Sequence, residues 1–141
     1  MNDCFLLDNV TLSKLTSAQR ASAFVRSRCR VPTAVLAEAQ GLTDAPALAA
    51  LEYKTTGDVL RKVTAVVRAL EPGDRMLDLF RNEGNGDVFL LAVALVEIDI
   101  AMQQLFADRW IIATDDKGLR RSSARWHVAT CTSAEFAELI G

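Results

Sequence analysis

The chain has little of what thiolate metal sites and disulfide frameworks require. Its 141 residues include three cysteines, which share no close spacing, and a single histidine, His127. We therefore expect neither a zinc site built from cysteine and histidine nor a disulfide framework. Free buried thiols are typical of a reducing cytosol, so the sequence predicts a cytoplasmic protein.

Long apolar runs are scarce as well. The most apolar stretch, 88–106, is interrupted by four polar side chains, with Glu97 and Asp99 among them. This pattern predicts a core helix rather than a membrane span. The N-terminus shows no signal-peptide pattern, because acids flank its short apolar run, and we expect no membrane association.

Neither sign of charge is in large excess. Sixteen Lys and Arg residues stand against eighteen Asp and Glu residues, which gives a net charge of −2. This balance argues against a protein coated in positive charge, although a local basic rim stays compatible with it. The length suits one domain with a real core, and no repeat or linker is visible, so we expect a single domain over 1–141.

Short apolar runs alternate with helical patterns along the chain. Strands are expected at 4–8, 30–31, 76–80, 110–114 and 127–130. Helices are expected at 10–15, 16–28, 32–40, 43–53, 87–106, 120–124 and 132–140. The stretch 58–70 fits both periods, and its apolar stripe favours a helix. The alternation predicts an α/β fold with a central parallel sheet and helices on both faces.

Two apolar strands end on acids. Asp8 closes the first strand, and Asp116, with Asp115 beside it, follows the strand at 110–114. The carboxyl ends of parallel strands lie at one edge of the sheet, so these acids should converge there. A glutamate in the helix after the second strand, Glu38, is a further candidate for the same edge.

Another acid, Asp87, opens the long helix after a glycine-punctuated loop. Carboxylates that converge repel one another unless a cation lies between them. Mg²⁺ or Mn²⁺ suits such a site because hard divalent ions prefer oxygen ligands. One or two such ions can activate water for attack on a phosphodiester, which requires no histidine.

Each acid also has an ordinary structural explanation. Asp8 and Asp87 suit the N-caps of the helices that follow them. Glu38 suits a solvated helix face, and Asp115 or Asp116 suits the cap of the next turn. The pattern alone leaves open whether these acids bind metal, and whether Asp115 or Asp116 is the fourth acid.

Five segments resemble, in order, the motifs of PIN-domain nucleases. They are LLDNVTLSKL, VPTAVLAEA, GNGDVFLLAVAL, WIIATDDKGLR and HVATCTSAEFAELI. The resemblance implies a three-layer α/β/α fold and a metal-dependent ribonuclease site. It assigns Asp8, Glu38, Asp87 and Asp116 to the metal-binding acids and Thr114 to the threonine before the fourth acid.

The resemblance extends to VapC-like toxins of toxin–antitoxin pairs. It implies an RNA substrate, a homodimer, and an antitoxin that covers the site. The chain departs from the family after its first aspartate, where Asn9 stands in place of the usual Thr or Ser. Asn9 is therefore a supporting candidate, with Asp115 and Glu83 as spare acids. The alternative function is a PIN-fold module that binds RNA or protein without catalysis.

Basic residues follow the acids along the chain. Lys14 comes after the first acid, and Lys117, Arg120, Arg121 and Arg125 come after the fourth. Around an acidic centre this charge would suit an RNA backbone, and solvated helix faces explain it equally well.

Apolar residues exceed what one small core needs. They form a stripe over 59–70 and a second run over 88–96. We therefore expect self-association through helices, because large exposed apolar patches usually mark interfaces.

Overall fold

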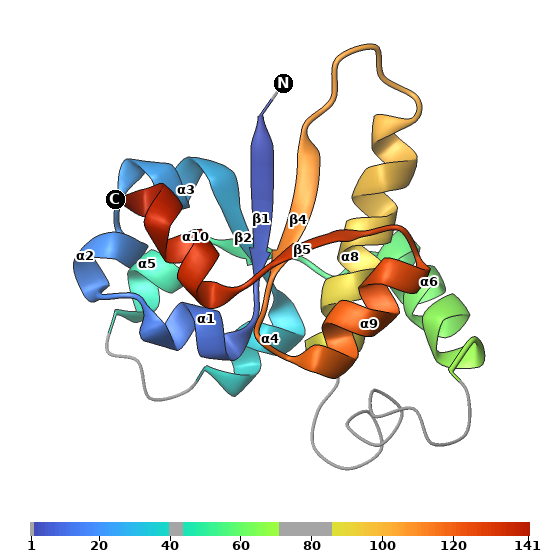
Figure 1. Ribbon diagram of the computed structural model, residues 1–141, viewed down its shortest axis with the longest axis horizontal. Helices are drawn as coiled ribbons and strands as arrows, with labels where there is room; N and C mark the ends of the chain where they lie inside the picture. Colours follow the sequence, from blue (N-terminus) through green and yellow to red (C-terminus); the bar gives the residue numbers. More distant parts are fainter. Residues whose placement is uncertain (1, 40–43, 71–85) are drawn as a thin grey trace.

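The computed structural model describes residues 2–39, 44–70 and 86–141 (Figure 1). The strand expected within 76–80 and the spare acid Glu83 lie outside the described residues.

The described residues form one sheet of five parallel strands in the order β3-β2-β1-β4-β5. The strands are β1 (Asp3–Leu7), β2 (Cys29–Pro32), β3 (Glu52–Tyr53), β4 (Arg109–Ala113) and β5 (Ala129–Cys131). In the central pair, Leu7 of β1 lies beside Ala113 of β4. All the pairings are parallel, which confirms the predicted α/β class.

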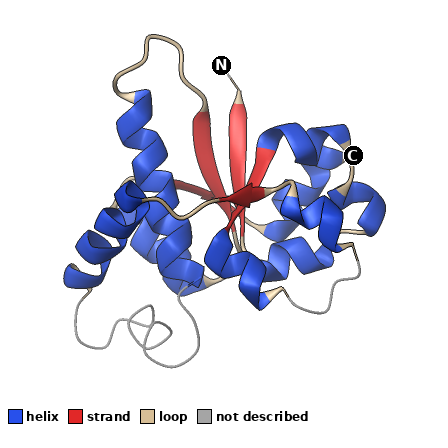
Figure 2. Cartoon of the chain, turned by 180° about the vertical axis from the view of Figure 1, so that it is seen from behind, coloured by secondary structure: helices blue, strands red, loops and turns tan. Residues whose placement is uncertain are grey.

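Helices lie on both sides of this sheet (Figure 2). They are α1 (Asn9–Lys14), α2 (Ser17–Arg20), α3 (Ala23–Arg28), α4 (Thr33–Glu38), α5 (Ala45–Ala49), α6 (Gly57–Arg68), α8 (Gly86–Ala101), α9 (Lys117–Arg125) and α10 (Ser133–Ile140). On one face Phe5 of β1 packs against Phe24 of α3 and Phe136 of α10. On the other face α8 crosses the sheet and packs against α6. The arrangement is consistent with the expected three layers.

The helix predicted over 16–28 is two helices. Thr16 caps α2 in a capping box with Gln19, and Ser22 then adopts an extended backbone and caps α3. The Ser22 side chain accepts a hydrogen bond from the Val25 amide at 3.3 Å. Serine competes for backbone hydrogen bonds, so it favours a helix start over a helix interior.

Two other helices end earlier than predicted. The helix expected over 43–53 ends at Ala49, and Leu51 instead joins the sheet edge, where its carbonyl accepts from Val31 N at 2.8 Å. The helix expected over 87–106 ends at Ala101, where the chain turns back toward β4. The helix expected over 120–124 is longer and begins at Lys117.

The core absorbs both apolar stretches. The α8 run Val88–Val96 is buried apart from half-buried Phe89, as expected for a helix apolar all round. On α6, Val59 and Val66 are buried while Leu60 is exposed. The stripe over 59–70 is mostly core, which removes the sequence-based reason for self-association through these helices. No helix among the described residues is long and apolar enough to cross a membrane.

Candidate functional site

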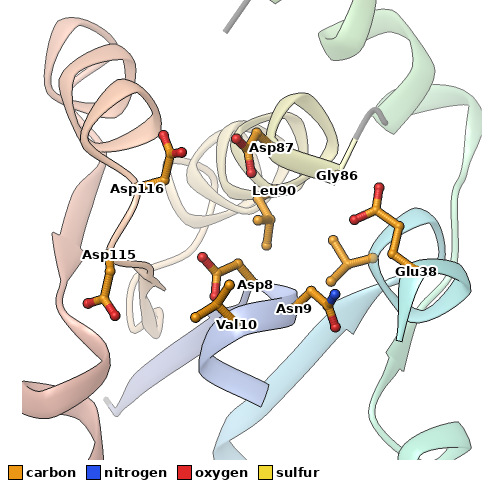
Figure 3. Close-up of a pocket in the computed structure, with 10 residues that line it drawn as sticks. Asp8, Asn9, Val10, Glu38, Gly86, Asp87, Leu90, Asp115 and Asp116 are labelled. Carbon is orange, nitrogen blue, oxygen red and sulfur yellow. The ribbon is translucent and has the colours of Figure 1, made fainter. Parts of the chain in front are cut away.

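Five acids line one cavity of about 330 Å³ at the carboxyl edge of the sheet (Figure 3). They are Asp8, Glu38, Asp87 and the adjacent pair Asp115 and Asp116, and they come from four different parts of the fold. Asp8 follows β1, Glu38 ends α4, Asp87 lies in the first turn of α8, and Asp116 precedes α9. The structure brings together Asp8, Glu38, Asp87 and Asp116, the four acids assigned to the metal, with the spare acid Asp115 beside them. Their role in metal binding stays a prediction.

Asp8 is both a helix cap and a wall of the cavity. Its Oδ1 accepts a hydrogen bond from the Thr11 amide at 2.7 Å, which makes it the N-cap of α1. Its Oδ2 accepts a hydrogen bond from the Thr114 hydroxyl. Only 8% of the residue is exposed. The capping explanation of Asp8 is confirmed, and the cap fixes the carboxylate at the edge of the cavity. Its role in metal binding stays a prediction.

Thr114 links two of the acids. Its hydroxyl donates to Asp8 and accepts a hydrogen bond from the Asp116 amide at 3.1 Å. Thr114 is fully buried, so neither bond competes with water. A second threonine, Thr11, donates its hydroxyl to the Ala113 carbonyl at 3.0 Å and ties α1 to β4. These contacts hold the first and fourth acids in a fixed relation.

The structure separates the two neighbouring acids after β4. Asp116 caps α9 by accepting from the Leu119 amide at 2.8 Å, and its carboxylate lies near Asp87 in Figure 3. Asp115 points away from Asp87 and accepts hydrogen bonds from the Ser133 hydroxyl and, at 2.8 Å, the Ser133 amide. These bonds, with Lys14 at 2.9 Å, lower the pKa of Asp115 to about 2.

Burial and the neighbouring acids shift the pKa of Asp87. Burial raises its pKa to about 7, and the negative charges of Asp116, Asp8 and Glu38 add to the effect in that order. Asp115 is not among the causes of this shift. The carboxyl that faces Asp87 after β4 is therefore that of Asp116.

Glu38 is held against the start of α8. Its carboxylate accepts a hydrogen bond from the Gly86 amide, which lowers its pKa, while burial has the larger effect and raises it. A Cβ atom at Gly86 would lie 3.2 Å from Oε2 of Glu38 and 3.3 Å from Cγ2 of Val35. A side chain at this position would be in tight contact with Glu38 and Val35, so one of these two side chains would have to shift.

Gly86→Ala is expected to lower the metal-dependent ribonuclease activity that the sequence predicts by about tenfold, because the methyl group would displace Glu38 from the cavity. The matched control is Gly57→Ala at the first residue of α6, where a Cβ would meet the flexible Arg61 side chain at 3.5 Å or more. Cleavage rates and thermal melts of both variants measure this. Equal activity in the two variants would show that the close approach of Gly86 to Glu38 has no functional role.

Asn9 carries a buried polar atom that lacks a partner. It lines the cavity, and its Oδ1 makes no hydrogen bond within the part of the chain that the structure describes. An unsatisfied buried acceptor costs free energy, so such atoms usually have a further partner such as water or an ion. Asn9 keeps its place as a supporting residue of the site.

The donor set fits a hard divalent ion with a water shell. The four acids form no ion pair with any described cation. No three carboxylate, imidazole or thiol groups among the described residues are grouped so that they could hold one metal ion. Mg²⁺ usually keeps several waters and uses one or two carboxylates, so a pair of these acids is sufficient.

Sequence reasoning missed Thr11 and Gly86. The position of Thr11, three residues after Asp8, is where a capping carboxylate finds its amide, so the signal was present. Gly86 precedes Asp87 directly, but its reason for being glycine lies in Glu38, which is distant in sequence. Lys14, predicted to add positive charge around the acids, instead pairs with Asp115.

A comparison with models of known protein families found no match to this chain, and a search among curated proteins found no match either.

Proposed function

We propose that the chain is an endoribonuclease that hydrolyses RNA phosphodiesters with Mg²⁺ or Mn²⁺. The observation that carries this proposal is the convergence of Asp8, Glu38, Asp87 and Asp116 in one cavity at the carboxyl edge of a parallel sheet. The ordered resemblance to the motifs of PIN-domain nucleases supports it. Ligands at this edge are the rule in open α/β sheets.

Each residue of the site would have its own role in this reaction. A bound divalent ion supplies an activated water and positive charge for the leaving oxygen. Asp87 and Asp116, the most strongly interacting pair, would hold the ion, with Asp8 beside them. Thr114 holds the Asp8 carboxylate in place by donating a hydrogen bond to it. Glu38 points into the cavity from the other side and would orient water or a second ion.

Regulation by a partner belongs to the same proposal. An antitoxin that covers the cavity, and assembly into a homodimer, rest on the resemblance to VapC-like toxins. The cavity is open to such a partner because Glu38 is exposed and Asp87 and Asp116 are half-buried.

A non-catalytic binding module is the second candidate, and one observation favours it. Asp8 and Asp116 both act as helix caps, and the described acids are not grouped for one ion as they stand. A module of this kind has no need of metal at the acids. Titration with Mn²⁺ separates the two candidates.

Incubation of labelled single-stranded RNA with the purified protein tests the proposal. We expect cleavage with Mn²⁺, none with chelator, and a loss of at least a hundredfold in Asp87→Asn, because the ion loses a ligand. Asp99→Asn is the matched control, since Asp99 lies on the same helix and pairs with Lys62 at 2.7 Å. Cleavage that persists in chelator or in Asp87→Asn would contradict the proposal.

A further inference from the structure

Helix α9 has two distinct faces. Its inner face carries the buried residues Gly118, Leu119, Ser122 and Ser123. The outer face carries exposed Lys117 and Arg121, one helical turn apart. Arg125 lies a further turn along, where its guanidinium donates to Ser122 at 3.1 Å. We call Lys117 and Arg121 the α9 stripe.

The stripe begins beside the acid cavity, and its side chains form no ion pair with another described residue. Lys117 directly follows Asp116, the acid that caps α9 and lines the cavity. Within the described ranges, neither Lys117 nor Arg121 forms an ion pair or hydrogen bond. By contrast, Lys14 is neutralised by Asp115.

Arg120 belongs to a different surface of the same helix. Its positive charge lowers the pKa values of Glu135 on α10 and Cys131 on β5, so its guanidinium lies toward those elements. It is half-buried rather than exposed. Arg120 therefore offers a matched control for the stripe, with the same helix and the same charge.

Lys117 occupies a helix position at which a positive charge is unfavourable. It is the first residue of α9, where the positive end of the helix dipole disfavours a cation. Asp and Glu are the residues that such a position favours. A lysine kept there without an acidic partner suggests a use outside the fold of the free protein.

We propose that the α9 stripe holds the phosphates of a single-stranded nucleic acid whose scissile phosphate enters the acid cavity. The inference rests on the proposed nuclease function. One helical turn separates the backbone positions of the two residues by about 6 Å, and both lysine and arginine bind phosphate oxygens well. Asp8 is almost buried at the cavity, so the strand must bend to reach it. A flexible single strand can bend in this way, whereas duplex is stiff.

The test measures binding without cleavage. The Asp87→Asn protein serves as the inactive background, and a labelled single-stranded oligoribonucleotide is titrated by fluorescence anisotropy over a series of salt concentrations. Adding Lys117→Gln or Arg121→Gln should weaken binding about threefold to tenfold. Each should also lower the slope of log affinity against log salt by about 0.7. Adding Arg120→Gln should leave affinity within about twofold, because Arg120 faces α10.

Thermal melts exclude misfolding as the cause. Lys117→Gln should melt slightly higher than its parent, because it removes a cation from the positive end of α9. Weaker binding in a more stable protein cannot come from misfolding. If Lys117→Gln, Arg121→Gln and Arg120→Gln all melt at a lower temperature and lose RNA affinity equally, the proposed role of the α9 stripe is wrong.

Three further outcomes decide the inference. If Arg120→Gln weakens RNA binding as much as Lys117→Gln and Arg121→Gln do, the inference is wrong. Any positive charge on α9 would then contribute to binding, whichever face of the helix carries it. Duplex RNA that binds more tightly than the single strand would also overturn it. Binding of a polyglutamate peptide through the stripe, without RNA binding, would show that the surface docks an acidic protein instead.

These experiments distinguish a failure of the stripe proposal from a failure of the nuclease proposal. If the native protein cleaves RNA while the stripe variants bind normally, the stripe is wrong and the nuclease stands. If the stripe is required for RNA binding but the native protein does not cleave with Mn²⁺, the stripe stands and the chain is a binding module.

Discussion

Asp87→Asn is expected to make the metal-free protein more stable at pH 8 by about 2 kcal/mol while abolishing metal-dependent cleavage. Burial and three neighbouring carboxylates raise the pKa of Asp87 from 3.8 to about 7. The folded protein therefore binds this proton more tightly than the unfolded chain. Stability falls as pH rises from about 4 to about 7, and the loss is complete above that range.

The size of this effect follows from the shift in pKa. A rise from 3.8 to about 7 corresponds to about 4 kcal/mol at 1.36 kcal/mol per pKa unit. Partial exposure of Asp87 lowers the expected value to about 2 kcal/mol. Asparagine keeps the shape and removes the charge, so the variant escapes the penalty at pH 8 and gains almost nothing at pH 4.

Denaturant unfolding with chelator at pH 4 and pH 8 measures the prediction. Asp99→Asn on the same helix is the control, and it should show no gain at pH 8 because Asp99 pairs with Lys62. Adding Mn²⁺ should stabilise the native protein by mass action and the Asp87 variant much less. A variant that is no more stable than the native protein at pH 8 would show that the four carboxylates do not repel one another.

Thr114→Val is expected to destabilise the protein by about 3 kcal/mol. The buried hydroxyl donates to the Asp8 carboxylate and accepts from the Asp116 amide. Valine has almost the same shape, so packing is kept while both buried polar groups lose a partner. Cleavage should fall by about a hundredfold even where the variant is folded, because Asp8 and the Asp116 loop are no longer held together.

Thr114→Ser is the matched control for this prediction. Serine keeps the hydroxyl and loses one buried methyl group, which costs about 1 kcal/mol. Unfolding in denaturant and cleavage with Mn²⁺ are measured for both variants below their melting temperatures. If Val and Ser lose the same stability and the same activity, the hydroxyl does not position the acids.

The sequence was sufficient to predict where the acids meet. The run FLL is buried on β1 and ends directly at Asp8, and the apolar run of β4 ends near Asp116. Parallel pairing of β1 with β4 then brings the two ends to one edge. The α/β class follows from the same alternation of apolar strands and helices, because local patterns determine both.

Contacts between distant residues decided what the sequence left open. Both Asp115 and Asp116 line the cavity, but the Asp115 carboxylate is engaged by Ser133 and Lys14, which leaves Asp116 as the acid beside Asp87. The need for glycine at Gly86 depends on Glu38. No periodicity in either segment encodes these partners, so sequence patterns alone left them undetermined.

Apolar periodicity also predicted the wrong end for α8. The pattern continues through Leu105 and Phe106, which suggested a helix to that point, yet these side chains are 89% and 77% exposed. The helix stops at Ala101 because the chain must return to begin β4 at Arg109 beside Asp3. The apolar pattern shows which side chains would be stabilised by burial. Which of them are buried here is determined by the path that the chain takes to the next strand.

Calorimetric titration of Mn²⁺ into three aspartate variants tests the proposed centre most directly. Asp87→Asn and Asp116→Asn should each weaken Mn²⁺ binding by at least about tenfold relative to the native protein, because each removes a ligand. Asp115→Asn should bind within about twofold of native, since Asp115 is engaged with Ser133 and Lys14. Native protein that binds no Mn²⁺, or an Asp115 variant that loses as much affinity as the Asp116 variant, would contradict a metal centre held by Asp87 and Asp116.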